Sequence, residues 1–316
     1  MKRYLKRIAN GKTLSPAEAE GAMHVLLEGD AEPEEAAGFL MGLRGRGETI
    51  DELVGFTRSM REHAVDVEAD DPHAIDLCGT GGDNSGTFNI STAASLVCAG
   101  TGVTVAKHGN RSVSSQSGSA DVLEVLGVNV ELEKEGAEHC LREAGIAFLF
   151  APFFHPAMRF VMPVRKALGV RTFFNILGPL CNPAGVSRQL VGAFARDVAR
   201  QIAYILARTG SEHIVSVHAH DGMDEFSLAA PTTTFTFDSN DDNEPREADV
   251  DPEEAHGVER APLEALQGGT AEDNAAIISE ILDGELGPPR DVVVLNAAYA
   301  LDTSGAFADL DACFEA

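Results

Sequence analysis

Residues 74–106 read AIDLCGTGGDNSGTFNISTAASLVCAGTGVTVA, and this stretch decides the fold class. Apolar runs at 74–78 and 103–106 predict two strands, and residues 90–99 between them predict a helix. Two strands that are joined by a helical crossover run parallel in one sheet. The stretch therefore predicts an α/β domain with a mainly parallel central sheet.

The alternation of strands and helices continues toward the C-terminus. Further strands are predicted at 147–150, 189–194, 213–218 and 233–237, and further helices at 120–126 and 272–282. An apolar run at 291–295 leads toward a last helix. Residues 238–254 are rich in Asp and Glu and nearly free of aliphatic side chains, so they predict a solvated loop.

Residues 8–66 predict a small all-helical unit. Capping-box patterns stand at 15–18 (SPAE) and 49–52 (TIDE), and Pro33 marks the start of a helix between them. The apolar faces of these three short helices exceed what they can bury in one another, so we expect them to pack also against later helices or a second subunit. We expect a helical domain at 1–68, joined by helices from about 155–183, and an α/β domain at 69–316.

The chain is strongly acidic. Asp and Glu number 50 against 24 Lys and Arg, which gives a formal net charge of −26. Such a charge repels phosphate backbones and anionic lipids, so neither nucleic acid nor a membrane surface is an expected partner. The acidic residues are spread along the whole chain, which suits molar salt, where the screening length falls to about 3 Å. A halophilic protein is therefore our hypothesis, and an ordinary acidic protein is the alternative.

Targeting and cysteine patterns point to a cytoplasmic protein. No apolar run approaches the ~20 residues of a membrane span, and the basic N-terminal residues lead into no apolar signal-peptide core. The five cysteines are widely spaced and form no C-x-x-C pair, so we expect neither a disulfide framework nor a thiolate zinc site.

The glycine-rich loop at 79–87 lies between a strand and a helix and is suited to bind phosphate. Glycines let backbone N–H groups crowd around an anion, and the N-terminus of the following helix adds unpaired amides and a positive dipole end. Ser91 and Thr92 add hydroxyl groups there. The loop matches neither the P-loop nor the dinucleotide pattern, and a mere tight turn is the alternative.

A second polar loop, KHGNRSVSSQSGS at 107–119, follows the next predicted strand. Lys107 and Arg111 arrive together at the carboxyl end of a strand, which is the edge of a parallel sheet that binds ligands. Two cations amid five serines fit a polyanionic ligand, and a flexible linker is the alternative reading.

Two further segments carry candidate ligand-binding groups. Asp224 and Glu225 follow a predicted strand and can hold Mg²⁺, whereas the nearby set His218, His220 and Asp221 would suit a transition metal instead. Arg165 begins a segment at 165–183 that is rich in cationic and aromatic residues, and its guanidinium could bind a carboxylate through two parallel hydrogen bonds. Two phosphate loops and an acid pair, without a recognisable nucleophile, indicate group transfer from an activated phosphorylated sugar.

Taken together, these segments resemble the anthranilate phosphoribosyltransferase family over essentially the whole chain. The resemblance rests on GTGGD at 79–83, NIST at 89–92, the loop at 107–115, SAD at 119–121, HPAM at 155–158, the segment 165–183, and Asp224 with Glu225. It implies a nucleoside phosphorylase/phosphoribosyltransferase-like fold, a homodimer formed through the helical domain, and an active site in the cleft between the domains. The implied reaction, in tryptophan biosynthesis, moves the phosphoribosyl group of 5-phosphoribosyl 1-pyrophosphate (PRPP) to the amine of anthranilate.

The resemblance also implies the site residues, with no covalent nucleophile among them. PRPP would be held by Gly79, Gly82, Asp83, Thr87, Asn89, Ile90, Ser91, Thr92, Lys107, His108, Gly109, Asn110, Arg111, Ser112, Val113, Ser114, Ser115 and Ser119. Anthranilate would be held by Gly79, His108, Asn110, Arg165 and Gly178, and two Mg²⁺ ions by Ser91, Asp224 and Glu225. Gln116 stands where a lysine is common, and the chain is expected to end about one helix early.

Three alternatives remain open at this point. The first is a pyrimidine-nucleoside phosphorylase of the same fold, and the second is a metal-dependent hydrolase centred on His218, His220 and Asp221. The third is an inactive paralogue that binds ligand without turning it over.

Overall fold

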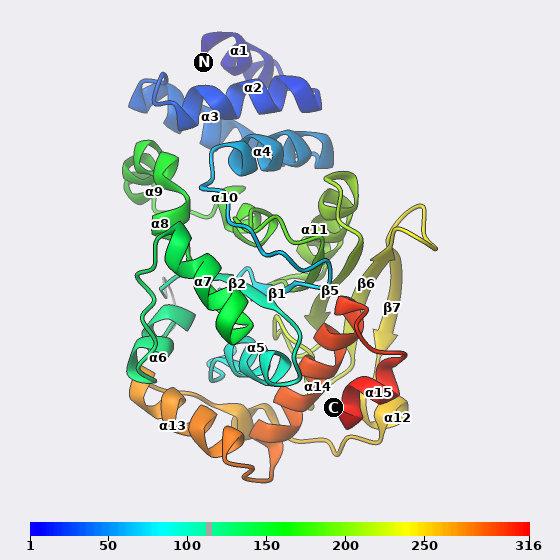
Figure 1. Cartoon of the computed structure of the whole chain (residues 1–316). Helices are drawn as coiled ribbons and strands as arrows, with labels where there is room; N and C mark the ends of the chain where they lie inside the picture. The colour runs from blue at the N-terminus through cyan, green and yellow to red at the C-terminus, as the bar shows by residue number, and fades with distance from the viewer. Residues whose placement is uncertain (112–115) are drawn as a thin grey trace.

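The computed structural model describes residues 1–111 and 116–316, and in it a layer of N-terminal helices lies at one end of an α/β body (Figure 1). The helices of this layer are α1 (Lys2–Ala9), α2 (Pro16–Leu27), α3 (Pro33–Arg46) and α4 (Ile50–Glu62). The capping boxes predicted at Ser15 and Thr49 are both formed, so the starts of α2 and α4 are confirmed. The N-terminus lies in this layer and the C-terminus at the opposite end of the body.

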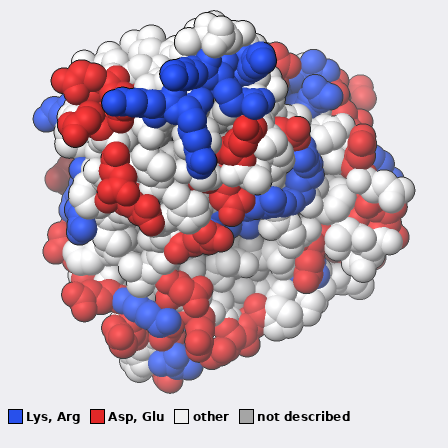
Figure 2. Space-filling view, turned by 90° about the horizontal axis from the view of Figure 1, so that it is seen from above, with Lys and Arg blue, Asp and Glu red and all other residues white. Residues whose placement is uncertain are grey.

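Helix α1 was not predicted, because only Tyr4 and Ile8 of its eight residues are buried. It packs closely on α3: a Cβ added at Gly42 would stand 2.7 Å from Cγ2 of Ile8. Its other face is basic, since Lys2, Arg3, Lys6 and Arg7 are all exposed. Seen from this end of the molecule, Lys and Arg atoms gather on the surface among patches of Asp and Glu (Figure 2).

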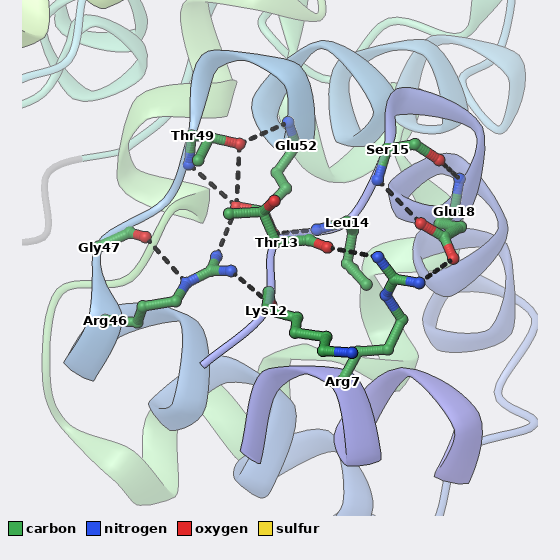
Figure 3. Close-up of polar contacts among 10 residues, drawn as sticks. All are labelled: Arg7, Lys12, Thr13, Leu14, Ser15, Glu18, Arg46, Gly47, Thr49 and Glu52. Carbon is green, nitrogen blue, oxygen red and sulfur yellow. Dashed lines mark hydrogen bonds and ion pairs between the residues drawn. The ribbon is translucent and has the colours of Figure 1, made fainter. Parts of the chain in front are cut away.

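A buried glutamate joins the start of α4 to the segment before α2 (Figure 3). Glu52 has none of its surface exposed and accepts hydrogen bonds from the backbone N–H of Leu14 at 2.8 Å and of Thr49 at 2.9 Å. Its charge is balanced by Nη2 of Arg46 at 2.5 Å. A fully buried carboxylate with this many donors is satisfied, so it fixes the relative position of the first helices.

The central sheet has seven strands in the order β3-β2-β1-β4-β5-β6-β7. Their bounds are β1 Ile75–Gly79, β2 Val105–Gly109, β3 Ile146–Phe150, β4 Arg188–Gly192, β5 His213–Ala219, β6 Thr232–Asp238 and β7 Arg246–Val250. Pairing is parallel from β3 through β5 and antiparallel for β5–β6 and β6–β7. The mainly parallel α/β architecture is therefore as predicted.

One predicted loop is wrong. Residues 238–254 contain β7, which pairs with β6, and the start of α12 (Pro252–His256). Four of the five β7 residues are exposed. An edge strand without a buried face has no apolar alternation, so the pattern that identifies strands was absent there.

Helices cover both faces of the sheet (Figure 1). They are α5 Ile90–Gly100, α6 Ser119–Val125, α7 Lys134–Ala144, α11 Arg196–Arg208, α13 Ala271–Leu282, α14 Pro288–Ser304 and α15 Leu310–Glu315, with the short helix η3 at Leu263–Leu266. The run at 291–295 lies inside α14 rather than before it, because its apolar residues are buried against α5 and the sheet. Helix α7 was not predicted, since only Ala137 and Leu141 are buried in it.

The segment between β3 and β4 returns to the N-terminal helices. It forms α8 Ala151–Phe154, η1 Pro156–Phe160, α9 Met162–Leu168, α10 Phe174–Leu177 and η2 Gly178–Leu180. Phe173, fully buried in this segment, stacks on Phe56 of α4 at 4.4 Å between ring centroids and meets Phe39 of α3 at 6.4 Å. One hydrophobic core therefore joins the first four helices to this segment and to α11. Within the described residues, no helix is both long and apolar enough to cross a membrane.

Candidate active site

The carboxyl ends of β1 and β4 meet at the centre of the sheet, where Gly79 pairs with Gly192. The chain crosses from β1 to β2 on one side, and β4 pairs with β1 on the other. Ligands of open α/β sheets bind at such a switch point. The candidate site is therefore built outward from these two glycines.

Both glycines are required by the neighbouring loop. A Cβ at Gly79 would stand 2.8 Å from Oδ2 of Asp224, and a Cβ at Gly192 only 1.6 Å from the Asp224 carbonyl oxygen. Asp224 can therefore lie against the ends of β1 and β4 only because these positions carry no side chain.

Three carboxylates crowd around this point. Asp224 Oδ2 accepts from Gly81 N–H at 3.1 Å, and Asp83 Oδ2 accepts from Asp224 N–H at 3.4 Å. Glu225 Oε1 accepts from Ser91 N–H at 3.1 Å, at the N-terminal end of α5. Burial, with the charge of Asp83 second, raises the pKa of Asp224 to about 7, and burial also raises the pKa of Glu225 well above its usual range. A bound cation would relieve both effects, so the acid pair is suited to hold Mg²⁺.

Lys107 of β2 contacts strand β1 just before the glycine-rich loop. Its side chain is buried, and Nζ donates to the Leu77 carbonyl oxygen at 2.5 Å. Burial lowers the pKa of Lys107, while the nearby charge of Asp76 opposes this change. Lys107 is also among the residues that line a cavity of about 70 Å³, together with Thr92 and Phe148. Lys107 thus brings a buried amino group to strand β1, two residues before the glycine-rich loop.

Side chains from α5 contact the end of the second polar loop. Asn89 Nδ2 donates to the Ser117 carbonyl oxygen at 3.3 Å, and Thr92 Oγ1 donates to Ser119 Oγ at 3.0 Å. The two predicted ligand loops are therefore adjacent. The expected PRPP-binding residues Ser112, Val113, Ser114 and Ser115 lie outside the described residues.

Other expected PRPP-binding residues have mainly structural contacts. Thr87 forms a bridge with Gln267, and Ile90 is fully buried at the start of α5. A Cβ at Gly109 would meet the ring of Phe148 at 2.6 Å, and a Cβ at Gly82 would meet Nη2 of Arg171 at 2.7 Å. These residues shape the loops around the site.

Arg111 is already paired within the chain. Nη1 donates to Asp121 at 2.9 Å and to Glu124 at 2.6 Å, and Nη2 donates to the other Glu124 oxygen at 2.8 Å. Asn110 Oδ1 accepts from the Arg111 N–H at 2.8 Å. The guanidinium that the sequence suggested for a polyanion is therefore engaged by two carboxylates of α6.

Two buried imidazoles lie on the other side of the loop. The rings of His108 and His155 are 5.1 Å apart, and within the described part of the chain Nε2 of each has no hydrogen-bond partner. Burial lowers the pKa of His108 to about 3 and that of His155 to about 4. Both rings are therefore neutral at ordinary pH. A Cβ at Gly178, whose backbone hydrogen-bonds to His108, would meet only open space.

Arg165 on α9 is a cation without an ionic partner among the described residues. Its guanidinium lies over the ring of Phe174 at 5.0 Å, and Nη1 is 3.7 Å from Sδ of Met162. Burial lowers the pKa of Arg165, and no carboxylate opposes this change. The side chain is thus held in place by a ring while its charge remains available for an anion.

Several residues that brace the site were missed. Arg171 Nη2 donates to the Gly82 carbonyl oxygen at 2.7 Å, which joins the segment after α9 to the phosphate loop. Asn274 of α13 donates to Asn89 Oδ1 at 2.9 Å, and Asn296 of α14 holds the loop after β5 through the Phe226 backbone. Arg171 stood in a segment already singled out, whereas the two asparagines lie within apolar helices and carried no local signal.

The three residues of the alternative transition-metal site do not lie together in the structure. His218 Nδ1 bonds to the Ala193 carbonyl oxygen, His220 contacts Asp249 at 3.2 Å, and Asp221 accepts from Ser227. Within the described residues these three side chains form no cluster of possible metal ligands. The hydrolase reading therefore has no support.

The fold and the site define a class of enzyme. Residues 2–64 match the helical bundle domain of the glycosyl transferase family, and residues 71–315 match its a/b domain. The chain is thus a glycosyltransferase with the two-part architecture of that family. It is 64% identical to the anthranilate phosphoribosyltransferase of Salinibacter ruber, over 100% of this chain and 92% of the relative. It is 48% identical to that of Moorella thermoacetica, over 97% and 89%.

Solved structures of anthranilate phosphoribosyltransferases have the same fold as this chain. The anthranilate phosphoribosyltransferase of Thermus thermophilus superposes with a TM-score of 0.91 at 42% identity, covering 99% of this chain and 92% of that one. The enzyme of Saccharomyces cerevisiae in complex with PRPP and Mg gives 0.86 at 26% identity, over 99% and 91%. The chain belongs to the anthranilate phosphoribosyltransferase family.

Proposed function

We propose that this enzyme transfers the phosphoribosyl group of PRPP to the amine of anthranilate, giving N-(5-phosphoribosyl)anthranilate and pyrophosphate in tryptophan biosynthesis. The observation that carries the proposal is the acid pair of buried Asp224 and half-buried Glu225, held against the glycine-rich loop and the N-terminus of α5. An anion-binding loop beside an unneutralised acid pair suits a pyrophosphate that arrives with a divalent cation.

Mg²⁺ fits the residues present, and we propose that Ser91, Asp224 and Glu225 hold two ions. The support is the raised pKa of both carboxyl groups, neither of which has a cationic partner at hydrogen-bond distance in the described structure. Bound Mg²⁺ would supply charge neutralisation for the departing pyrophosphate. The N–H groups of the 79–87 loop, and Lys107 bound to strand β1 just before it, add positive potential from the chain itself.

Anthranilate would be oriented from the opposite side of the cleft. Arg165 is expected to bind its carboxylate, while Gly79, His108, Asn110 and Gly178 line its ring. His108, neutral because of its low pKa, adds no charge that would compete with Arg165. The neutral aromatic amine of anthranilate attacks the ribose C1: the C1–N bond forms, the C1–O bond to pyrophosphate breaks, and the nitrogen releases one proton. Positioning and charge stabilisation supply the rate, and no residue is needed as a covalent nucleophile.

The direct test is the loss of anthranilate fluorescence when PRPP and Mg²⁺ are added, measured in molar KCl and in dilute buffer. Turnover that needs all three components supports the proposal. A folded protein that shows no turnover in either buffer would refute it, and phosphorolysis of a pyrimidine nucleoside would then be assayed.

We further propose a cytoplasmic homodimer adapted to high salt, with domains at 1–68, joined by helices from about 155–183, and at 69–316. A basic α1 face on a chain of net charge −26 offers charge complementarity to a second copy, and Met41 on the adjacent α3 is 41% exposed. The expected mass in solution, measured by light scattering, is that of two chains.

A further inference from the structure

A cluster of possible metal ligands lies in the helical layer, away from the candidate active site. His24 lies in α2, Glu28 is the C-cap residue of α2, and His63 is the C-cap residue of α4. One ligand atom from each of the three side chains lies within 4.8 Å of the others. None of the three contributes to the proposed reaction.

The chemistry of the set selects the kind of ion. His63 Nδ1 lies 2.8 Å from the Ser59 carbonyl oxygen, and a carbonyl can only accept, so the proton is on Nδ1 and Nε2 keeps its lone pair. A ring fixed in this way by a backbone carbonyl is the usual arrangement of a metal-binding histidine. The ring of His24 is 4.8 Å away between centroids. Two imidazoles and a carboxylate favour zinc, cobalt or nickel over Mg²⁺.

The surroundings favour a cation. Both α2 and α4 end at the cluster, so the negative ends of two helix dipoles converge there. Glu62 Oε2 lies 3.1 Å from His24 Nε2, and Glu20 also borders the cluster. The nearest cation in sequence, Arg61, is directed away, because its guanidinium donates to the Leu180 and Thr209 carbonyl oxygens at 2.8 and 3.1 Å.

We propose that His24, Glu28 and His63 bind one divalent transition-metal ion that ties the C-terminal end of α2 to that of α4. The ion would join two helices that share the hydrophobic core of the N-terminal layer. Its role is to stabilise that layer, since none of the three ligands is among the residues assigned to the reaction. A second arrangement, Glu20, His24 and Glu62, shares His24 but not His63.

The test uses Co²⁺ as the probe, with untagged full-length protein and excess Mg²⁺ to occupy the active site. We expect one Co²⁺ per chain with visible absorption typical of nitrogen ligands, and a rise in the thermal midpoint when Zn²⁺ is added. His63→Gln is expected to weaken Co²⁺ binding by at least about tenfold. His139→Gln, at an exposed histidine of α7, is the matched control and is expected to bind like the unmodified chain.

Two results would overturn the proposal. If His63→Gln binds Co²⁺ as tightly as the control, the ligand set is wrong and the arrangement without His63 replaces it. If neither variant nor the unmodified chain binds Co²⁺ at micromolar concentration, there is no site. Should His63→Gln fail to fold, Glu28→Gln tests the same set at an exposed helix end, with circular dichroism as the check on folding.

Discussion

Replacing Gly192 by alanine is the sharpest test of how the acid pair is positioned. The added Cβ would stand 1.6 Å from the Asp224 carbonyl oxygen, whereas ordinary contact begins at 3.4 Å, so the loop must move by at least 3.4 − 1.6 = 1.8 Å. Misplacing a catalytic group by about 1 Å can cost about 100-fold in rate. We therefore expect kcat/KM to fall by at least about 100-fold, which corresponds to roughly 2.7 kcal/mol of lost transition-state stabilisation.

The assay is anthranilate fluorescence at saturating Mg²⁺, with circular dichroism to show that the variant is folded. Gly79→Ala is the graded case, because its Cβ would stand 2.8 Å from the Asp224 side chain and needs a smaller shift. Gly100→Ala is the control, since a Cβ there meets nothing within 4 Å. If folded Gly192→Ala has a kcat/KM within about threefold of the Gly100→Ala control, Gly192 does not position the acid pair. If Gly192→Ala does not fold, Gly79→Ala must still lose activity relative to Gly100→Ala.

Four further predictions follow from the site and the charge. Arg165→Ala is expected to raise the KM for anthranilate by about 10- to 100-fold, the worth of a charge-assisted hydrogen bond, and equal effects on the KM for PRPP would contradict its assigned role. Combining Asp224→Asn with Glu225→Gln is expected to abolish Mg²⁺-dependent turnover, and near-normal rates would remove both as ligands. Because the pKa of Asp224 is raised from 3.8 to about 7, the Asp224 carboxyl group of the folded chain keeps its proton until the pH passes about 7. Its contribution to the free energy of unfolding is therefore greatest in acid and is lost as the pH rises from about 4 to 7. Mg²⁺ must displace that proton, so its affinity should fall by about tenfold per unit below pH 7, and titration calorimetry that finds no such dependence would reject the shift. Finally, a chain of net charge −26 should unfold at a higher temperature in molar KCl than in dilute buffer. A thermal unfolding midpoint that is the same in both buffers would favour an ordinary acidic protein.

The sequence predicted most of the elements that bury a whole face, although helix α11, which buries six of its residues, was not predicted. Strands β1 and β2 are continuous buried runs, and α2 and α4 begin with capping boxes that the structure forms. Helix α7 and strand β7 bury little, so their sequences carry no period that could be recognised. Hydrophobic patterning reports burial, so elements that remain mostly exposed are the hardest to predict from it.

The residues of the candidate site also fall into those that the sequence predicted and those that it did not. The glycine-rich loop and the acid pair were predicted because their chemistry is local in sequence. Gly192 and Asn274 were not, because each acts on a residue far along the chain: Gly192 makes room for Asp224, and Asn274 bonds to Asn89. Arg111 shows a third case. Its carboxylate partners, Asp121 and Glu124, lie one turn apart in α6. The sequence alone does not show whether the guanidinium binds these carboxylates or an external anion.

The outermost strand, β7, also determines how the chain behaves when it is crowded. An edge strand has a free row of N–H and C=O groups that can pair with another molecule. In β7 the sequence is READV, so Arg246, Glu247 and Asp249 place charges on an edge that is almost entirely exposed. Charged side chains on an exposed edge strand are one of the features by which natural sheets discourage such pairing. The edge that patterning overlooked is thus the one that opposes fibrous self-association of the enzyme.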